Sequence, residues 1–154
     1  MKRRGFTFIE LLIVLAVIGI LASLAVLRYI DLRNHAIASG IVSELNAMRL
    51  ATYNYWADRS SFPPEAATGV TPTGLGHYLR DGFEFSRPLY SYDYENFSGS
   101  ADGGASAGLR VGIVVTTVDN GLAAILARRA AGGLPYFMVG NTLTYIIVGP
   151  DGQM

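Results

Sequence analysis

The strongest pattern in the sequence is a long apolar run near its N-terminus. Of the 22 residues from Phe6 to Leu27, 18 are apolar, and no charge occurs between Leu11 and Leu27. As a helix this segment would span about 33 Å, close to the ~30 Å hydrocarbon thickness of a bilayer. The run therefore predicts a membrane-spanning helix, and a cleaved signal peptide is the competing interpretation because Ser23-Leu24-Ala25 fits a small-x-small cleavage site.

Beyond Leu27 the pattern changes from uniformly apolar to amphipathic, and no proline occurs before Pro63. Mostly apolar residues recur three, four or seven positions apart, which is the spacing of one helix face. These positions are Ile30, Ile37, Ile41, Leu45, Met48, Thr52 and Tyr55. The pattern predicts one helix from Phe6 to Ser60, ended by Pro63 and Pro64, with a lipid-facing half and a half that packs on a globular head.

The rest of the chain predicts short strands and turns. Thr73 is expected to cap a helical turn over residues 74–80, and alternation predicts strands around Phe83–Phe85 and Tyr90–Tyr94. The row of Tyr90, Tyr92 and Tyr94 favours packing against the long helix over a binding surface. Glycine-rich residues 98–108 are expected to form a flexible loop.

The last third of the sequence predicts strand, helix and hairpin in turn. The Val- and Ile-rich segment Leu109–Val118 predicts a strand. Asp119-Asn120-Gly121 could form a tight turn, but the following residues favour a helix over Leu122–Ala131, capped by Asp119 or Asn120 and ended by Gly132-Gly133. Tyr136–Val139 and Thr142–Val148 flank Gly140-Asn141 and predict a terminal hairpin.

These elements define an α+β fold in which a long N-terminal helix packs on a small antiparallel β-sheet head. The expected organisation is a leader at 1–5, a transmembrane and assembly helix at 6–28, its amphipathic continuation at 29–60 and a globular head at 61–154. The composition agrees with one apolar segment attached to an ordinary soluble domain, since 51% of the residues are hydrophobic and 16% are charged.

The charges are balanced but unevenly placed. Twelve basic and twelve acidic residues give no net charge, and three of the cations, Lys2, Arg3 and Arg4, precede the apolar run. This cluster predicts that the N-terminus stays in the cytoplasm and that the head lies outside it. No later basic run exists, so no nucleic-acid footprint is predicted.

Glu10 is the one charge that the apolar run contains after its basic leader. A carboxylate at mid-membrane costs about 2.5–3.5 kcal/mol on insertion scales, and less near an interface. Neither a signal peptide nor a simple anchor has a use for it. A free α-amino group created by a nearby cut would supply the missing partner for Glu10.

The sequence from Arg4 to Val14, Arg-Gly-Phe-Thr-Phe-Ile-Glu-Leu-Leu-Ile-Val, resembles the leader and helix start of type IV pilins and of type II secretion pseudopilins. The resemblance implies that a prepilin peptidase cuts after Gly5 and that Phe6 is N-methylated. It also implies that Glu10 sets register by meeting the N-terminal amine of a neighbouring subunit. The family often has a proline midway along this helix, where this chain has Leu27.

By the same resemblance the chain is a structural subunit, first in the inner membrane and then in a periplasmic or cell-surface filament. The implied partners are homologous pilin or pseudopilin subunits, prepilin peptidase, the inner-membrane assembly platform and, before assembly, membrane lipid. Nucleic acid is expected only for a DNA-uptake filament. The choice between pilus, secretion pseudopilus and DNA-uptake filament stays open. The Tyr145–Gly152 ending and the absence of cysteine slightly favour a pseudopilin or minor pilin.

Catalytic chemistry is sparse, so no enzyme and no cofactor are predicted. There is no cysteine, and the two histidines, His35 and His77, are interpreted as surface residues. Asp119 and Asp151 stand apart without the alternating ligands of a calcium loop. The alternative function is a secreted or membrane-anchored ligand-binding domain with an ordinary signal sequence, whose tyrosine-rich strands would form the binding surface.

Overall fold

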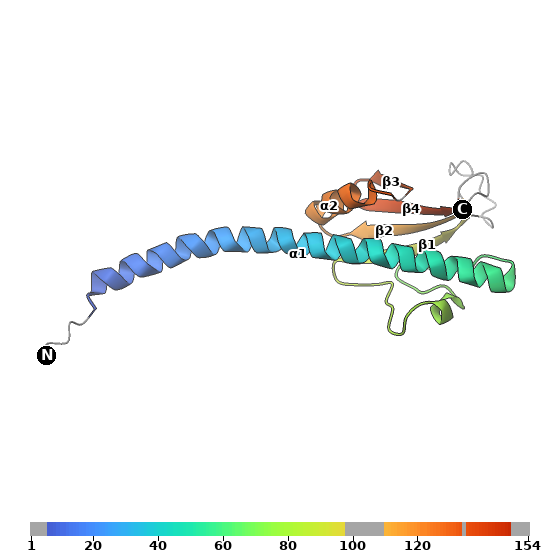
Figure 1. The fold of residues 1–154 in the computed structure, drawn as a ribbon, viewed down its shortest axis with the longest axis horizontal. Coiled ribbons are helices and arrows are strands. Elements are labelled where there is room, and N and C mark those ends of the chain that lie inside the picture. Colours follow the sequence, from blue (N-terminus) through green and yellow to red (C-terminus); the bar gives the residue numbers. More distant parts are fainter. Residues whose placement is uncertain (1–5, 98–109, 134, 149–154) are drawn as a thin grey trace.

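The computed structural model describes residues 6–97, 110–133 and 135–148, which form a long helix carrying a small head (Figure 1). The predicted leader 1–5, the predicted loop 98–108 and the tail from Gly149 lie outside the described residues. The elements are α1 (Phe8–Arg59), η1 (Leu75–Tyr78), β1 (Tyr90–Asn96), β2 (Val111–Thr117), α2 (Asn120–Ala130), β3 (Tyr136–Val139) and β4 (Thr142–Val148). The predicted α+β fold class is confirmed.

The helix α1 runs without interruption for 52 residues. It begins two residues after the predicted start at Phe6 and ends one residue before Ser60. Ser60 takes a left-handed conformation with φ 54°, and its N–H donates to the carbonyl of Trp56 at 2.7 Å, so the last turn is closed. Pro63 and Pro64 follow in a segment without regular structure.

Only the C-terminal half of α1 packs on the head. Its buried residues lie three or four positions apart, as a single helix face requires. They are Ala38, Ile41, Leu45, Met48, Ala51, Thr52 and Tyr55. Ile30, which the predicted stripe included, is 47% exposed because the head first contacts α1 near Asn34.

The four strands form one antiparallel sheet in the order β1-β2-β4-β3. Because side chains alternate across a strand, each strand presents one face to α1 and one face outward. Tyr92 of β1, Val115 of β2 and Tyr145 of β4 all lie on the inner face, where each is fully buried. The short helix α2 packs against α1 at the end of the head nearest the N-terminal half of α1 (Figure 1).

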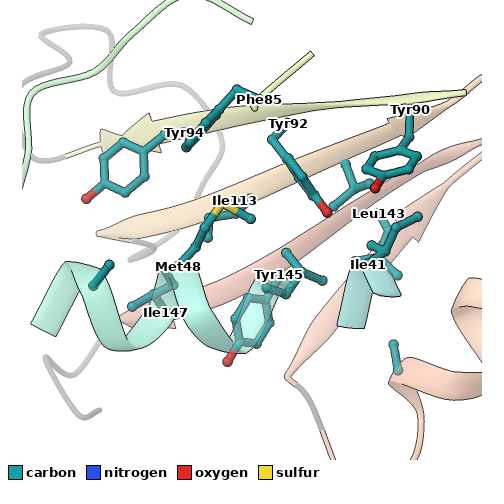
Figure 2. Close-up of a cluster of buried hydrophobic side chains, with 14 of the residues drawn as sticks. Ile41, Met48, Phe85, Tyr90, Tyr92, Tyr94, Ile113, Leu143, Tyr145 and Ile147 are labelled. Carbon is teal, nitrogen blue, oxygen red and sulfur yellow. The ribbon is translucent and has the colours of Figure 1, made fainter. Parts of the chain in front are cut away.

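Aromatic and branched side chains fill the space between α1 and the sheet (Figure 2). Tyr90, Tyr92 and Tyr94 all point into this core, with exposures of 9% or less. Phe85 is also buried and meets the ring of Tyr92 edge-on, with centroids 6.0 Å apart. The tyrosine row therefore packs against the long helix, as its alternation favoured.

Two local predictions are wrong. Phe83–Phe85 is not a strand: its alternation is produced by two aromatic side chains that pack on the core, and only Ser86 forms an isolated bridge, to Ser91. Thr73 does not cap η1, because Gly74 occupies the cap position with φ 83° and no side chain satisfies the free amides there. Both errors concern the irregular segment between α1 and β1, whose shape depends on tertiary contacts.

Candidate functional site

The start of α1 is closed by a reciprocal pair of hydrogen bonds between Thr7 and Glu10. The Thr7 hydroxyl accepts from the backbone N–H of Glu10 at 3.4 Å, and the Thr7 backbone N–H donates to Oε2 of Glu10 at 2.8 Å. The same hydroxyl also donates to Oε2 at 2.7 Å. The carboxylate lies at the positive end of the helix dipole, which favours its negative charge there.

This arrangement is a capping box, in which a threonine and the glutamate three residues later satisfy two of the amides that a helix start leaves free. The capping role of Thr7 was not predicted, although the four residues Thr-Phe-Ile-Glu are the sequence signature of a capping box. Glu10 thus has partners within its own chain before any neighbour is considered.

The apolar surface of α1 beyond this cap is uncovered. Within the described residues α1 is the one helix long and apolar enough to cross a membrane, and none of its most apolar stretch is buried against the rest of the chain. Phe6, the predicted methylation site, is 81% exposed and precedes the helix in non-helical backbone. Gly5 and the basic residues Lys2, Arg3 and Arg4 lie outside the described residues.

A second polar constellation, which the sequence did not reveal, joins α1 to the head through Glu44. Oε1 of Glu44 accepts from Arg87 at 3.0 Å and from Arg80 at 3.2 Å. Oε2 accepts from the hydroxyls of Tyr92 at 2.6 Å and Tyr90 at 3.2 Å. The Glu44 side chain is only 12% exposed, and burial together with this carboxylate raises the pKa of Tyr92 far above its usual range.

His35 and His77 lie on the surface, and the carboxylate of Asp119 is occupied by the amides of Gly121 and Leu122 at the start of α2. Among the residues that the structure describes, no three metal-ligating side chains converge. Asp151, the other acid considered for calcium, lies outside them.

The tyrosine row that the alternative function would use as a binding surface is buried in the structure. Tyr92 and Tyr94 are fully buried, and Tyr90 is 9% exposed. Their rings fill the interior between β1 and α1 (Figure 2). A ligand could not reach the row without opening the core.

Comparison with known proteins agrees with the site at the start of α1. Residues 1–26 match the prokaryotic N-terminal methylation motif. The chain is 36% identical over 78 residues to the fimbrial protein EcpC of Eikenella corrodens, covering 50% of this chain and 51% of that protein. It is also 36% identical over 62 residues to type II secretion system core protein G of Klebsiella pneumoniae, covering 40% of this chain and 44% of that protein.

A longer but weaker similarity extends over the head. The chain is 27% identical over 152 residues to the type IV major pilin protein PilE1 of Neisseria gonorrhoeae, covering 97% of this chain and 63% of that protein. The chain spans about half the length of the curated relatives EcpC and the minor fimbrial protein of Dichelobacter nodosus. No solved structure gives a significant match.

The motif, the homologues and the fold are all similar to those of pilins, and the resemblance inferred from residues 4–14 is confirmed. More narrowly, the proteins that the chain is similar to are type IV pilins, fimbrial proteins and a type II secretion pseudopilin, and it shares the N-terminal methylation motif. Proteins of the pilin family are structural subunits and not enzymes. The described helix α1 is long and apolar enough to cross a membrane, which agrees with the similarity to pilins.

Proposed function

We propose that this chain is cut between Gly5 and Phe6 by a prepilin peptidase, methylated on Phe6 and then polymerised through its N-terminal helix. The observation that carries the proposal is the Thr7–Glu10 pair at the start of an otherwise uncovered apolar helix. Glu10 caps the helix start, but a capping box accepts an uncharged glutamine at this position, so an anchor helix would not need the charge that is costly in lipid.

The first stage of the proposal is membrane insertion. Residues 6–28 span the inner membrane, Lys2, Arg3 and Arg4 hold the leader on the cytoplasmic side, and residues 29–60 carry the head at 61–154 outside. Membrane lipid covers the apolar side chains of α1 before assembly. Like helices, and the subunits of the inner-membrane assembly platform, take the place of lipid afterwards.

The second stage gives Glu10 a new partner. In the uncut chain its carboxylate accepts from the Thr7 backbone amide at 2.8 Å, one residue from the nitrogen that a cut after Gly5 would free. A neighbouring subunit's methylated amine carries a positive charge, which the amide of Thr7 does not. Pairing the two charges relieves the desolvation of both when lipid is replaced by helix contacts, and it fixes the register of one helix against the next.

Mass spectrometry of the membrane-extracted chain, coexpressed with a prepilin peptidase, tests the first stage. We expect loss of residues 1–5 and one added methyl group on Phe6. Gly5→Leu is the matched control that should remain uncut. A chain that still begins at Met1, or one that begins at Val26 after an ordinary signal cut, contradicts the proposal.

Filament recovery tests the second stage. Glu10→Gln keeps the size and hydrogen-bonding oxygen of the side chain but removes its charge. The variant should be cut and methylated normally, yet sheared filaments should fall by more than about a hundredfold, because removing one partner of a buried charge pair costs about 3–5 kcal/mol. Normal filament yield from Glu10→Gln would show that the charge has no part in assembly.

A further inference from the structure

The large apolar side chains of the head that are most exposed lie together at one end of the sheet. Val118 is 75% exposed and follows β2, where its N–H donates to the Leu89 carbonyl at 3.0 Å. Val139 is 72% exposed and ends β3, paired with Thr142 beside the turn. The N–H of Thr117 donates to the Asn141 carbonyl in that turn at 3.1 Å, which places both valines at the same edge.

This edge faces the apolar half of α1. The carboxylate of Asp119, the residue after Val118, accepts from the side-chain amide of Asn34 on α1 at 3.2 Å. Asn34 is seven residues beyond Leu27, so the edge lies only about 10 Å past the apolar run. Figure 1 shows α2 and the end of β2 on this side of the head.

The sheet residues beside Val139 on the outer face are uncharged. Across three neighbouring strands, the outer face presents Val139, then Thr142, then Thr116. Phe137, which is 48% exposed, lies two residues before Val139 on the same face of β3. We call Thr116, Val118, Phe137, Val139 and Thr142 the basal corner. The nearby carboxylate of Asp119 is already engaged by the start of α2.

Charged residues suited to phosphate lie between the apolar run and the basal corner. Arg28 and Arg33 are exposed on α1, and within the described residues neither forms an ion pair. They stand about 1.5 and 9 Å beyond Leu27 along the helix, which spans the ~5–8 Å headgroup layer on one side of a bilayer. Asp31 lies between them, so the segment is not uniformly basic.

We propose that the basal corner rests on the phospholipid headgroup layer while the subunit waits in the membrane. This inference rests on the proposed function in one respect, namely that residues 6–28 span the bilayer. A sheet packed on a helix lies about 10 Å from its axis, and a tilt of about 20° toward the sheet lowers the corner by about 3 Å. The helix then enters the bilayer with Val118 and Val139 at headgroup depth and Arg28 and Arg33 among the phosphates.

Such a contact would fix the direction in which the subunit tilts before assembly. A single helix leaves the subunit free to tilt toward any side. A second contact through the basal corner favours the tilt that lowers the sheet toward the membrane, so the head of each subunit is held at the same angle to the bilayer. Extraction into the filament then requires the corner to leave the lipid.

Site-specific labelling of the full chain in phospholipid nanodiscs tests this contact. The sequence has no cysteine, so Val118→Cys and Val139→Cys each carry a single fluorescent label. Quenching by lipids spin-labelled in the headgroup should be several-fold stronger for both than for Asn54→Cys. Asn54 is an exposed α1 residue 20 positions, about 30 Å, beyond Asn34.

Leu27→Cys separates failure of the inference from failure of the proposed function. If its label is quenched while those at 118 and 139 match the label at 54, the subunit is inserted and the basal corner does not touch the membrane, which overturns the inference. If the label at 27 is also unquenched, the membrane stage itself is wrong and the inference is overturned with it. Quenching of the labels at 118 and 139 that appears only with two chains per nanodisc would show that the contact depends on a second subunit. That result would overturn the inference as well.

Discussion

The carboxylate of Glu44 on α1 accepts a 2.6 Å hydrogen bond from the hydroxyl of Tyr92 on β1, across 48 residues of sequence. The same carboxylate binds Arg87 at 3.0 Å, from the irregular segment that precedes β1. Glu44 therefore ties the long helix, the connecting segment and the first strand to one point. The long helix and the head are held together by this polar group as well as by apolar packing.

Replacing Glu44 with glutamine should destabilise the head by about 2–3 kcal/mol. The change removes the charge that Arg87 and Arg80 neutralise and leaves the half-buried guanidinium of Arg87 without its counterion. Urea denaturation of the full chain in detergent, followed by the fluorescence of its single tryptophan, Trp56, measures the loss. Glu84→Gln is the control, since Glu84 is exposed in the same connecting segment. Equal midpoints for the two variants would contradict the role of Glu44.

Sequence patterns predicted the structure correctly where the spacing of apolar residues, or a turn signal, matched the element that forms. The buried positions from Ile41 to Tyr55 follow helical spacing, and the terminal hairpin has its predicted limits because Gly140-Asn141 marks a two-residue turn. The same reasoning failed at Phe83–Phe85, where alternation arises from two rings that pack on the core in an irregular segment. Periodicity reports which side chains are buried but not whether the backbone has a strand neighbour.

The polar sites likewise include one that could be predicted from the sequence and one that could not. Glu10 and Thr7 are three residues apart, so their pairing is a local property that the sequence contains. Glu44 meets Arg80, Arg87, Tyr90 and Tyr92 at separations of 36 to 48 residues. No short-range sequence pattern predicts these contacts, because they depend on how the segment after α1 folds back along the helix.

The buried and exposed faces of the C-terminal half of α1 should respond differently when a leucine is truncated. Leu45→Ala removes a fully buried side chain and should cost about 3 kcal/mol in the unfolding of the head. Leu50→Ala, on the same helix but 61% exposed, should change it by less than about 0.5 kcal/mol. Urea denaturation in detergent compares them. Similar losses for both would mean that the head does not pack on α1 along the Ile41–Leu45–Met48 face.

Glu95 should make the head less stable as pH rises. Burial, followed by the carboxylates of Asp93 and Glu65, raises the pKa of Glu95 above its ordinary value. The folded chain therefore holds the proton more tightly than the unfolded chain, and the stabilisation present at low pH is lost as pH rises from the ordinary value through the raised one. Glu95→Gln should increase stability at pH 7 by up to about 0.5 kcal/mol and have no such benefit near pH 4.

Denaturant titrations of Glu95→Gln at the two pH values check this sign, with Glu84→Gln as the exposed control. The informative quantity is the difference between variant and wild type at each pH, since other carboxylates titrate in the same range. A benefit of equal size at pH 4 and pH 7 would show that the effect of Glu95 is unrelated to its charge.

Asp119 should stabilise the basal end of the head by capping α2. Its carboxylate accepts from Gly121 at 3.0 Å and Leu122 at 3.3 Å, and also from Asn34 of α1. Asp119→Ala should therefore cost about 1–2 kcal/mol in urea, whereas Asp119→Asn keeps a capping oxygen and should lose much less. Asn34→Ala isolates the contact to α1. If alanine and asparagine at position 119 behave alike, capping is not the source of the stability.

Thr7→Ala should fray the first turn of α1 without changing the rest of the helix. Thr7 and Glu10 satisfy each other's backbone amides, and loss of a capping side chain costs about 1 kcal/mol, or roughly fivefold in local opening. Amide hydrogen exchange of residues 9–11 in detergent measures that opening. Thr7→Ser should keep the protection, and Ser23→Ala should leave it unchanged, since the Ser23 hydroxyl only donates to the Ile20 carbonyl in mid-helix. Protection in Thr7→Ala equal to that in Thr7→Ser would mean that the Glu10 carboxylate is held by something other than the cap.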